Sequence, residues 1–280
     1  MELKRRFRFR GNAAAFGGRL IRPVDIVIEN SAAASLTVVG GRSRSRVGTQ
    51  HFGDEVRLES AAAFAEGLFD DSKQYEELTY QRGREELLTT STHVTSEVNG
   101  LVIGLKPQLT IARVRGGLRA TTPLGSGETP VWPTDESVIE GLAIEGHKLI
   151  VELNTPLFQR LNTHAKLLAA ADDPAFVREN GDHLFMQAAF EGRAIPSTGR
   201  VVGCDYTMST IVRRLRWDGA PFPGSQLDGN LAVVPGLGRL YFGEMLVTTT
   251  SKRLTMIRME LGSPCGGFFG CCEQEANGYW

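Results

Sequence analysis

Arginines recur at every second position in several short segments of the sequence, and their spacing is the feature that most directly suggests chemistry. On extended backbone, residues two apart point to the same face, so such a segment presents a row of guanidinium groups. A guanidinium is a planar, multidentate donor that suits carboxylates and phosphates. The arginines are Arg6, Arg8 and Arg10; Arg42, Arg44 and Arg46; Arg113 and Arg115; and Arg213, Arg214 and Arg216.

Two interpretations of these rows stay open. Either a row binds a polyanion or an acidic protein surface, or its arginines face water and pair with Glu and Asp on neighbouring strands. The second is favoured, because 31 Lys and Arg residues are balanced by 32 Asp and Glu residues and the formal charge is −1. Binding of single-stranded nucleic acid would require aromatic residues interleaved with the arginines, and few are present.

A cysteine cluster near the end of the sequence is a weak candidate metal site. Cys265, Cys271 and Cys272 could offer three thiolates to zinc, which prefers four sulfur or nitrogen ligands. However, no Cys-x-x-Cys pair and no nearby histidine accompanies them. We therefore expect free thiols, with an oxidised loop disulfide as the next alternative, and neither a bound metal nor a cofactor.

Catalytic motifs are not evident. The sequence has no Gly-x-Ser-x-Gly elbow and no His-Glu-x-x-His, and its five histidines are scattered without ligand spacing. The carboxylate pairs Glu85-Glu86 and Asp172-Asp173 could serve glycoside hydrolysis only if they flanked a bond at a set separation. No catalytic residue is assigned, and an enzyme is not favoured.

Alternation with a period of two, punctuated by Gly and Pro, predicts that most of the chain is β-strand. The 32 glycines and 12 prolines are typical of short strands joined by tight turns. The predicted strands include 6–10, 35–39, 42–47, 89–98, 101–105, 109–115, 118–122, 184–190, 200–206, 210–217, 231–234, 239–250 and 254–261.

A helical insertion is predicted over about residues 155–180. One helix begins at Thr155, which caps its free amides, followed by Pro156, which needs no amide hydrogen; its apolar stripe reaches Leu168. A second helix is predicted from Asp173 to Asn180. The fold class is therefore mainly β, an antiparallel β-sandwich-like architecture with this short insertion.

The chain is expected to form a single β-rich unit over residues 1–280, or sub-units 1–125 and 134–280 joined by a Gly- and Pro-rich loop. No apolar run is long enough for a signal peptide or a membrane span. A cytoplasmic location is therefore expected, with non-classical export or cell-surface association as alternatives.

An internal echo relates residues 98–104 to residues 139–146, since both carry an apolar-x-Gly-Leu-x-Ile pattern followed by a Leu-led strand. The echo predicts a duplicated β-hairpin. Together with the strand patterns at 241–247 and 253–261, it resembles uncharacterised bacterial all-β proteins of surface or secreted type. Because these patterns are strands and not sites, the resemblance transfers no functional residue.

The function expected from the sequence is a non-enzymatic structural or interaction protein that self-assembles into a homo-oligomer. Open strand edges and arginine-rich faces would make the contacts, the latter against acidic stretches such as 70–86. The first alternative is a β-sandwich module that binds a glycan or a polyanion. The second is a sugar-directed hydrolase, which would need carboxylates converging in a cleft.

Overall fold

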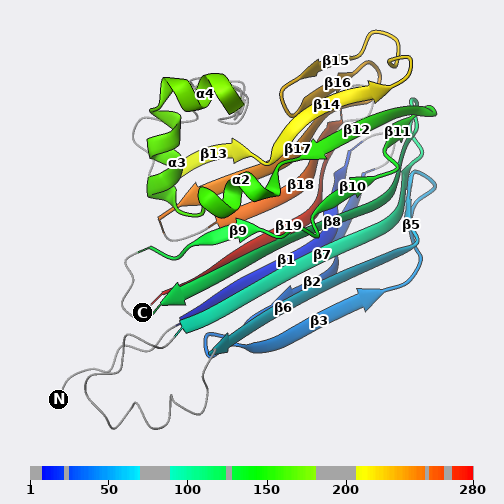
Figure 1. Ribbon diagram of the computed structural model, residues 1–280. Coiled ribbons are helices and arrows are strands. Elements are labelled where there is room, and N and C mark those ends of the chain that lie inside the picture. The colour runs from blue at the N-terminus through cyan, green and yellow to red at the C-terminus, as the bar shows by residue number, and fades with distance from the viewer. Residues whose placement is uncertain are drawn as a thin grey trace, which may run out of the picture.

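The computed structural model describes residues 8–21, 25–69, 89–123, 128–180, 206–249, 252–261 and 267–279. The predicted strand at 184–190, all but the last residue of the predicted strand at 200–206, the acidic stretch 70–86, and Arg6, Cys204 and Cys265 lie outside these ranges. The described residues form two antiparallel sheets that face one another, with short helices at one end (Figure 1). The predicted mainly-β, sandwich-like fold is confirmed.

The smaller sheet lies at the back in Figure 1 and joins the two ends of the chain, because β1 pairs with β19. Its strands, in spatial order, are β15 (Gln226–Asp228), β16 (Leu231–Val234), β17 (Gly238–Thr248), β18 (Lys252–Leu261), β19 (Gly267–Tyr279), β1 (Arg8–Leu20) and β2 (Ile26–Ser35), with β13 (Tyr206–Thr210) also beside β17.

The larger sheet lies in front and has the long hairpin β7–β8 at its centre. Its path runs through β14 (Val212–Asp218), β12 (His147–Leu153), β11 (Ala143–Ile144), β8 (Leu109–Pro123), β7 (Thr89–Ile103), β5 (Val56–Leu58) and β4 (Gln50–Phe52). Off this path, β9 (Val131–Pro133) and β10 (Val138–Glu140) pair with β8, β6 (Ser60–Phe69) pairs with β7, and β3 (Gly41–Val47) pairs with β6.

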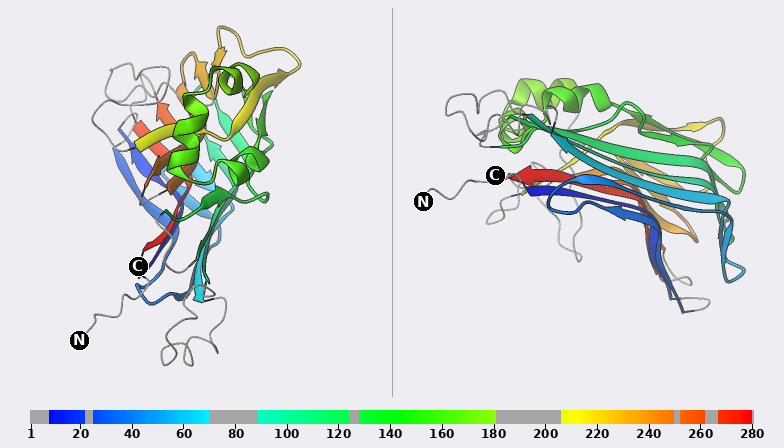
Figure 2. Two further views of the ribbon diagram at one scale, coloured as in Figure 1. Left: turned by 60° about the vertical axis from the view of Figure 1, so that its left-hand side comes forward. Right: turned by 90° about the horizontal axis from the view of Figure 1, so that it is seen from below.

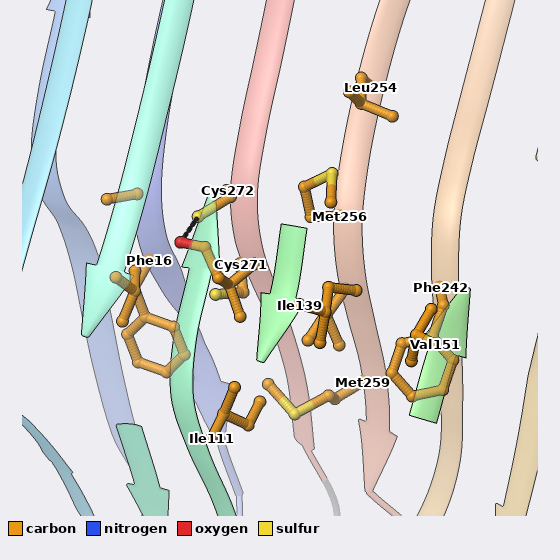
Figure 3. Packing of buried hydrophobic residues seen from close by; sticks show 14 of the residues in the cluster. Phe16, Ile111, Ile139, Val151, Phe242, Leu254, Met256, Met259, Cys271 and Cys272 are labelled. Atoms are coloured by element: carbon orange, nitrogen blue, oxygen red, sulfur yellow. Dashed lines mark hydrogen bonds between the residues drawn. The ribbon is translucent and has the colours of Figure 1, made fainter. Parts of the chain in front are cut away.

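Apolar side chains from the inner faces of both sheets make one buried core. Figure 3 shows a part of it, in which Phe16 of β1, Ile111 of β8 and Met256 of β18 point into the space between the sheets. Burial of apolar area at this scale is the main favourable term in folding. The core includes strands from both ends of the chain. The face of each strand that packs into the core leaves the opposite face exposed to solvent.

Several glycines lie inside strands, although the sequence predicted that they would end them. Gly100 lies inside β7, Gly116 and Gly117 lie inside β8, and Gly17 and Gly18 lie inside β1. The expected strands 89–98 and 101–105 are therefore one strand, as are 109–115 and 118–122. Glycine within a strand often marks a bulge or a close backbone approach, and both occur here.

A line of kinks crosses the smaller sheet, and its strands bend there. On five neighbouring strands the pairing passes over one residue and then continues in the same register, in the order Gly243, Met256, Cys272, Ala15 and Ala32. The φ angles of Gly243, Cys272 and Ala32, which lie on alternate strands, are 59°, 54° and 54°. A β-bulge, at which the register shifts, follows between Phe16 and Gly18 of β1. Figure 2 (right) shows the strands changing direction part-way along their length.

The first predicted helix is in fact two. The helices are α2 (Thr155–Arg160), α3 (His164–Ala171) and α4 (Pro174–Asn180). Thr155 lies inside α2 and donates to Asp135 Oδ1 at 3.0 Å, so it is not the cap; Asn154 precedes the helix without a capping hydrogen bond. The chain leaves helical geometry at Leu161, and Thr163 caps α3. The second predicted helix is confirmed as α4.

Candidate functional site

Two of the three arginines of β8 share a glutamate of β7. Glu97 Oε2 accepts hydrogen bonds from Arg113 Nη2 at 3.2 Å and from Arg115 Nη1 at 3.0 Å, while its Oε1 accepts one from Asn99. Burial alone would raise the pKa of Glu97, but these hydrogen bonds outweigh it and lower the pKa. Arg115 also pairs with Glu136.

Other arginines singled out from the sequence pair with a glutamate directly across a neighbouring strand or close to it. The pairs are Arg10 with Glu275 at 2.9 Å, Arg42 with Glu66, and Arg216 with Glu152 at 2.9 Å. The positive and negative side chains are thus interleaved on the same sheet face, which accounts locally for the near-zero net charge. Arg8 lies on β1 two residues from Arg10.

Four of these arginines make no ion pair within the described part of the chain, namely Arg44 and Arg46 on β3, and Arg213 and Arg214 on β14. All four are exposed. On β3 the register explains the difference, because Arg42 lies opposite Glu66, whereas Arg44 lies opposite Phe64 and Arg46 opposite Ala62. The structure thus leaves unpaired cations at both margins of the larger sheet, because β3 and β14 lie at opposite ends of its strand order.

The β3 margin of the molecule carries two unpaired strand edges. Among the described strands, β2 pairs only with β1 and β3 pairs only with β6, so each has one free side. A free edge presents unpaired backbone donors and acceptors to other chains. The large apolar side chains that the described residues expose also lie here, with exposed fractions of 38% to 78%: Ile21, Val27, Val38, Val39 and Leu68.

A shallow depression of about 230 Å³ lies on the outer face of the smaller sheet, at the β-bulge between Phe16 and Gly18. Its floor is the bare backbone of Gly17 and Gly270, which pair across β1 and β19. The carboxylate that it contains is Glu273, and this side chain pairs with Arg253. A glycosidase needs two carboxylates that flank one bond, and this depression offers a single neutralised one.

The cysteines that the structure describes are packed in the core. The positive φ of Cys272 lets the side chains of the adjacent residues Cys271 and Cys272 both lie in the core, and both are free thiols. Cys272 Sγ donates to Val114 O at 3.2 Å, drawn as the dashed line in Figure 3. The hydrogen bond with Cys272, together with burial, raises the pKa of Cys271, so this thiol stays protonated. Within the described ranges no three metal-ligating side chains gather.

Residues 7–248 match the family described as a domain of unknown function, DUF8256. The chain belongs to this family. Comparisons with curated proteins and with solved structures gave no match. The DUF8256 match includes β2, β3 and the arginines of the larger sheet, but the family description assigns none of them a role. Function must therefore be argued from these surfaces.

None of the helices in the described ranges of this DUF8256 chain is long and apolar enough to cross a bilayer. The resemblance to surface or secreted bacterial proteins stays a prediction, because the family match says nothing about it.

Sequence reasoning missed a buried ion pair that joins the helices of this DUF8256 chain to its smaller sheet. Lys252 Nζ donates to Glu128 Oε1 at 2.9 Å and to Thr129 O at 3.0 Å, and the Lys252 side chain is 0% exposed. The same carboxylate accepts the backbone amides of His164 and, at 3.3 Å, Ala165, the first residues of α3. The sequence did indicate that Lys252 is buried, because it is two residues from the core residue Leu254 and therefore points to the same face of the strand.

A second missed cluster lies on the outer face of the smaller sheet, where Arg258 bridges the line of kinks. Its guanidinium donates twice to Glu244, at 2.6 and 2.8 Å, and once to Glu260. It also stacks over the Tyr241 ring, with Cζ 3.8 Å from the centroid. Burial raises the pKa of Tyr241. Bidentate pairing and stacking favour arginine over lysine here, and the cluster ties β17 to β18.

Proposed function

We propose that this chain is a non-enzymatic interaction protein that associates with a second copy of itself through the free edge of β2. The observation that carries the proposal is the coincidence of an unpaired ten-residue strand with the exposed apolar side chains at its two ends. A strand edge is complementary to the same edge of another copy, because backbone donors and acceptors alternate along it.

The free edge of β2 is less protected than that of β3. Natural proteins guard open edges with charged side chains, and β3 carries Arg42, Arg44 and Arg46 on its exposed face. By contrast, β2 carries one charged residue, Glu29, and exposes Val27 at 67%. The arginine-rich faces expected from the sequence to make the contacts are less suitable, since several of their arginines already bind glutamates of the same chain.

Antiparallel pairing of two β2 strands about a two-fold axis suits the apolar residues at both ends. One end carries Ile21 and Val27, and the other leads into the turn with Val38 and Val39. In an antiparallel pair the first end of one copy lies beside the second end of its partner, so apolar residues meet apolar residues twice. Such an isologous contact closes at a dimer and does not propagate into fibres.

The test is the mass in solution, measured by size-exclusion chromatography with light scattering over a range of concentrations. The unmodified protein is expected at twice the chain mass of 30.6 kDa. The double variant Val27→Lys, Val39→Lys places a charge at each end of the edge and is expected to elute as a monomer. A matched control, Ala169→Lys, Ala175→Lys, adds the same charge on exposed positions of α3 and α4 and is expected to stay dimeric.

A monomer at all concentrations up to about 100 µM would refute the proposal, since the dissociation constant of a specific homodimer lies well below this concentration. Retention of the dimer in the Val27→Lys, Val39→Lys variant would show that association uses another surface.

A further inference from the structure

We propose that the outer face of the larger sheet binds single-stranded nucleic acid, along a track from Arg44 and Phe64 on the β3–β6 margin to Arg119 and Trp132 on β8 and β9. This site is on the face of the sheet and not on its edge, so it is separate from the β2 contact proposed above.

The first support is that the register places an aromatic side chain beside an arginine at both ends of the track. Phe64 lies directly across from Arg44, and Trp132 directly across from Arg119. Both aromatic side chains are half-buried, and both arginines are exposed. Aromatic rings flanked by cations are what sequence-tolerant recognition of single strands requires, because bases stack on the rings while phosphates meet the cations. The sequence did not reveal this pairing, since the partners are about 20 and 13 residues apart.

The second support is that the nearby carboxylates are already taken. Glu66 pairs with Arg42, and Glu97 accepts hydrogen bonds from Arg113 and Arg115. Glu136 pairs with Arg115 as well. Within the described ranges, Arg44, Arg46 and Arg119 therefore make no ion pair and can bind phosphate oxygens in a bidentate manner.

The third support is the row of small residues beside Phe64, since across the strands the register continues to Thr95 on β7 and then to Gly117 on β8. Trp132 lies three strand spacings from Phe64 and two residues further along the strands, opposite Arg119, so the two rings are roughly 16 Å apart. His93, which lies opposite Arg119 with its ring centroid 6.0 Å from that of Phe64, adds a third ring between them. A sulfated glycan would use the arginines but has no base to stack, so the two aromatic residues favour nucleic acid.

The test is fluorescence anisotropy with a labelled 20-nucleotide oligothymidylate, titrated with the full chain between 50 and 200 mM NaCl. Binding in the micromolar range is expected at the lower salt, and three phosphate contacts predict a slope of about −2 for log affinity against log salt. The variant Arg44→Ala, Arg46→Ala is expected to weaken binding by about tenfold and to reduce the slope to about −0.7. Phe64→Leu is expected to weaken binding by about tenfold while leaving the slope unchanged.

The matched control is Arg10→Ala, Arg253→Ala, which removes the same charge from ion pairs on the smaller sheet and is expected to leave affinity within twofold. Equal weakening by this control would assign binding to net charge and overturn the site. Absence of oligothymidylate binding at 50 mM NaCl would overturn the proposal outright. Heparin binding that is lost in Arg44→Ala, Arg46→Ala but indifferent to Phe64→Leu, with no oligothymidylate binding, would replace nucleic acid by a sulfated polyanion.

Discussion

Replacing Glu128 by glutamine tests the buried pair that holds α3 against the smaller sheet. The substitution keeps a hydrogen-bond acceptor of the same shape but removes the negative charge, so the Lys252 ammonium, 0% exposed, loses its counter-charge. Removal of one partner from a buried pair costs about 3–5 kcal/mol, because the other charge stays uncompensated. For a chain of this size the cost corresponds to a fall in Tm of about 10 °C.

A double-mutant cycle separates the charge interaction from packing. Lys252→Met, Glu128→Gln removes both charges and leaves no uncompensated group, so we expect it to be more stable than Glu128→Gln alone by about 2 kcal/mol or more. The free energy of unfolding is measured by urea titration with far-UV circular dichroism, and unchanged m-values confirm that the unfolding transition is comparable. Additivity of the two single variants within about 0.5 kcal/mol would refute the reasoning.

An exposed ion pair supplies the control. Arg19 and Asp25 lie 2.7 Å apart, closer than Lys252 and Glu128, but their side chains are 56% and 57% exposed. Water solvates both charges when the pair is broken, so Asp25→Asn is expected to leave Tm within measurement error. A similar fall in Tm for both variants would mean that burial does not explain the contribution of the Lys252–Glu128 pair to stability.

The pH dependence gives a second readout with a defined sign. Burial opposes ionisation of Glu128, but hydrogen bonds from Lys252 and from the backbone of His164 outweigh it and hold the pKa below its ordinary 4.5. A depressed carboxyl pKa stabilises the fold above pH 4.5, and this contribution is lost as pH falls through the folded pKa. The unmodified protein should therefore lose more stability between pH 5 and pH 3 than Glu128→Gln does.

At alkaline pH the difference in stability between the two proteins is also expected to narrow. Burial lowers the pKa of Lys252 below 10.5, with partial compensation by Glu128. Without that compensation the unfolded chain binds more protons than the folded one, so stability rises with pH until the unfolded lysine also titrates. Glu128→Gln is thus expected to regain stability between pH 7 and pH 10, relative to the unmodified protein.

Two further substitutions probe a crowded glycine beside β8 and the Arg258 cluster of the smaller sheet. Gly141→Ala is expected to cost about 2–4 kcal/mol, because φ is 64° and the new Cβ would lie 2.5 Å from Ala112 Cβ, whereas Gly146→Ala, at φ 81° with no atom within 4 Å, is expected to cost about 1 kcal/mol. Equal losses in urea unfolding would contradict the crowding. Arg258→Lys is expected to cost about 2 kcal/mol, because lysine cannot make the bidentate contact with Glu244. A loss no larger than that of Arg253→Lys, whose side chain is half-exposed, would contradict this.

The fold class was readable from the sequence because period-two alternation reports directly which face of a strand is buried. Strand ends were less readable. A glycine in the sequence is compatible with a turn and with a position inside a strand. Only the pairing with the next strand distinguishes the two, as at Gly100, which lies inside β7. The split between α2 and α3 was equally hidden, because the apolar stripe through Leu161 continues across the break.

The arginine rows show that spacing in the sequence does not indicate which arginines have a counter-charge. Alternation correctly places Arg42, Arg44 and Arg46 on one face, but whether each has a counter-charge depends on the residue opposite, which is more than 15 positions away in the sequence. Only the β3–β6 register distinguishes Arg42, beside Glu66, from Arg44, beside Phe64. A site made of cross-strand neighbours therefore has no local sequence signature.

The internal echo has a structural reason that the two copies alone did not reveal. Its glycines, Gly100 and Gly141, flank Ala112 of the central strand β8 from opposite sides, with φ angles of 61° and 64°. Positions equivalent in the two copies also share partners, since Asn99 and Glu140 both lie opposite Arg113. On both sides of β8 the pairing passes over Ala112 and the glycine that faces it without a shift of register, and glycine adopts the positive φ of these two positions at the least cost. The repeat in the sequence thus reflects one bend of the sheet, imposed on β7 and on the β10–β11 segment by the strand that they share.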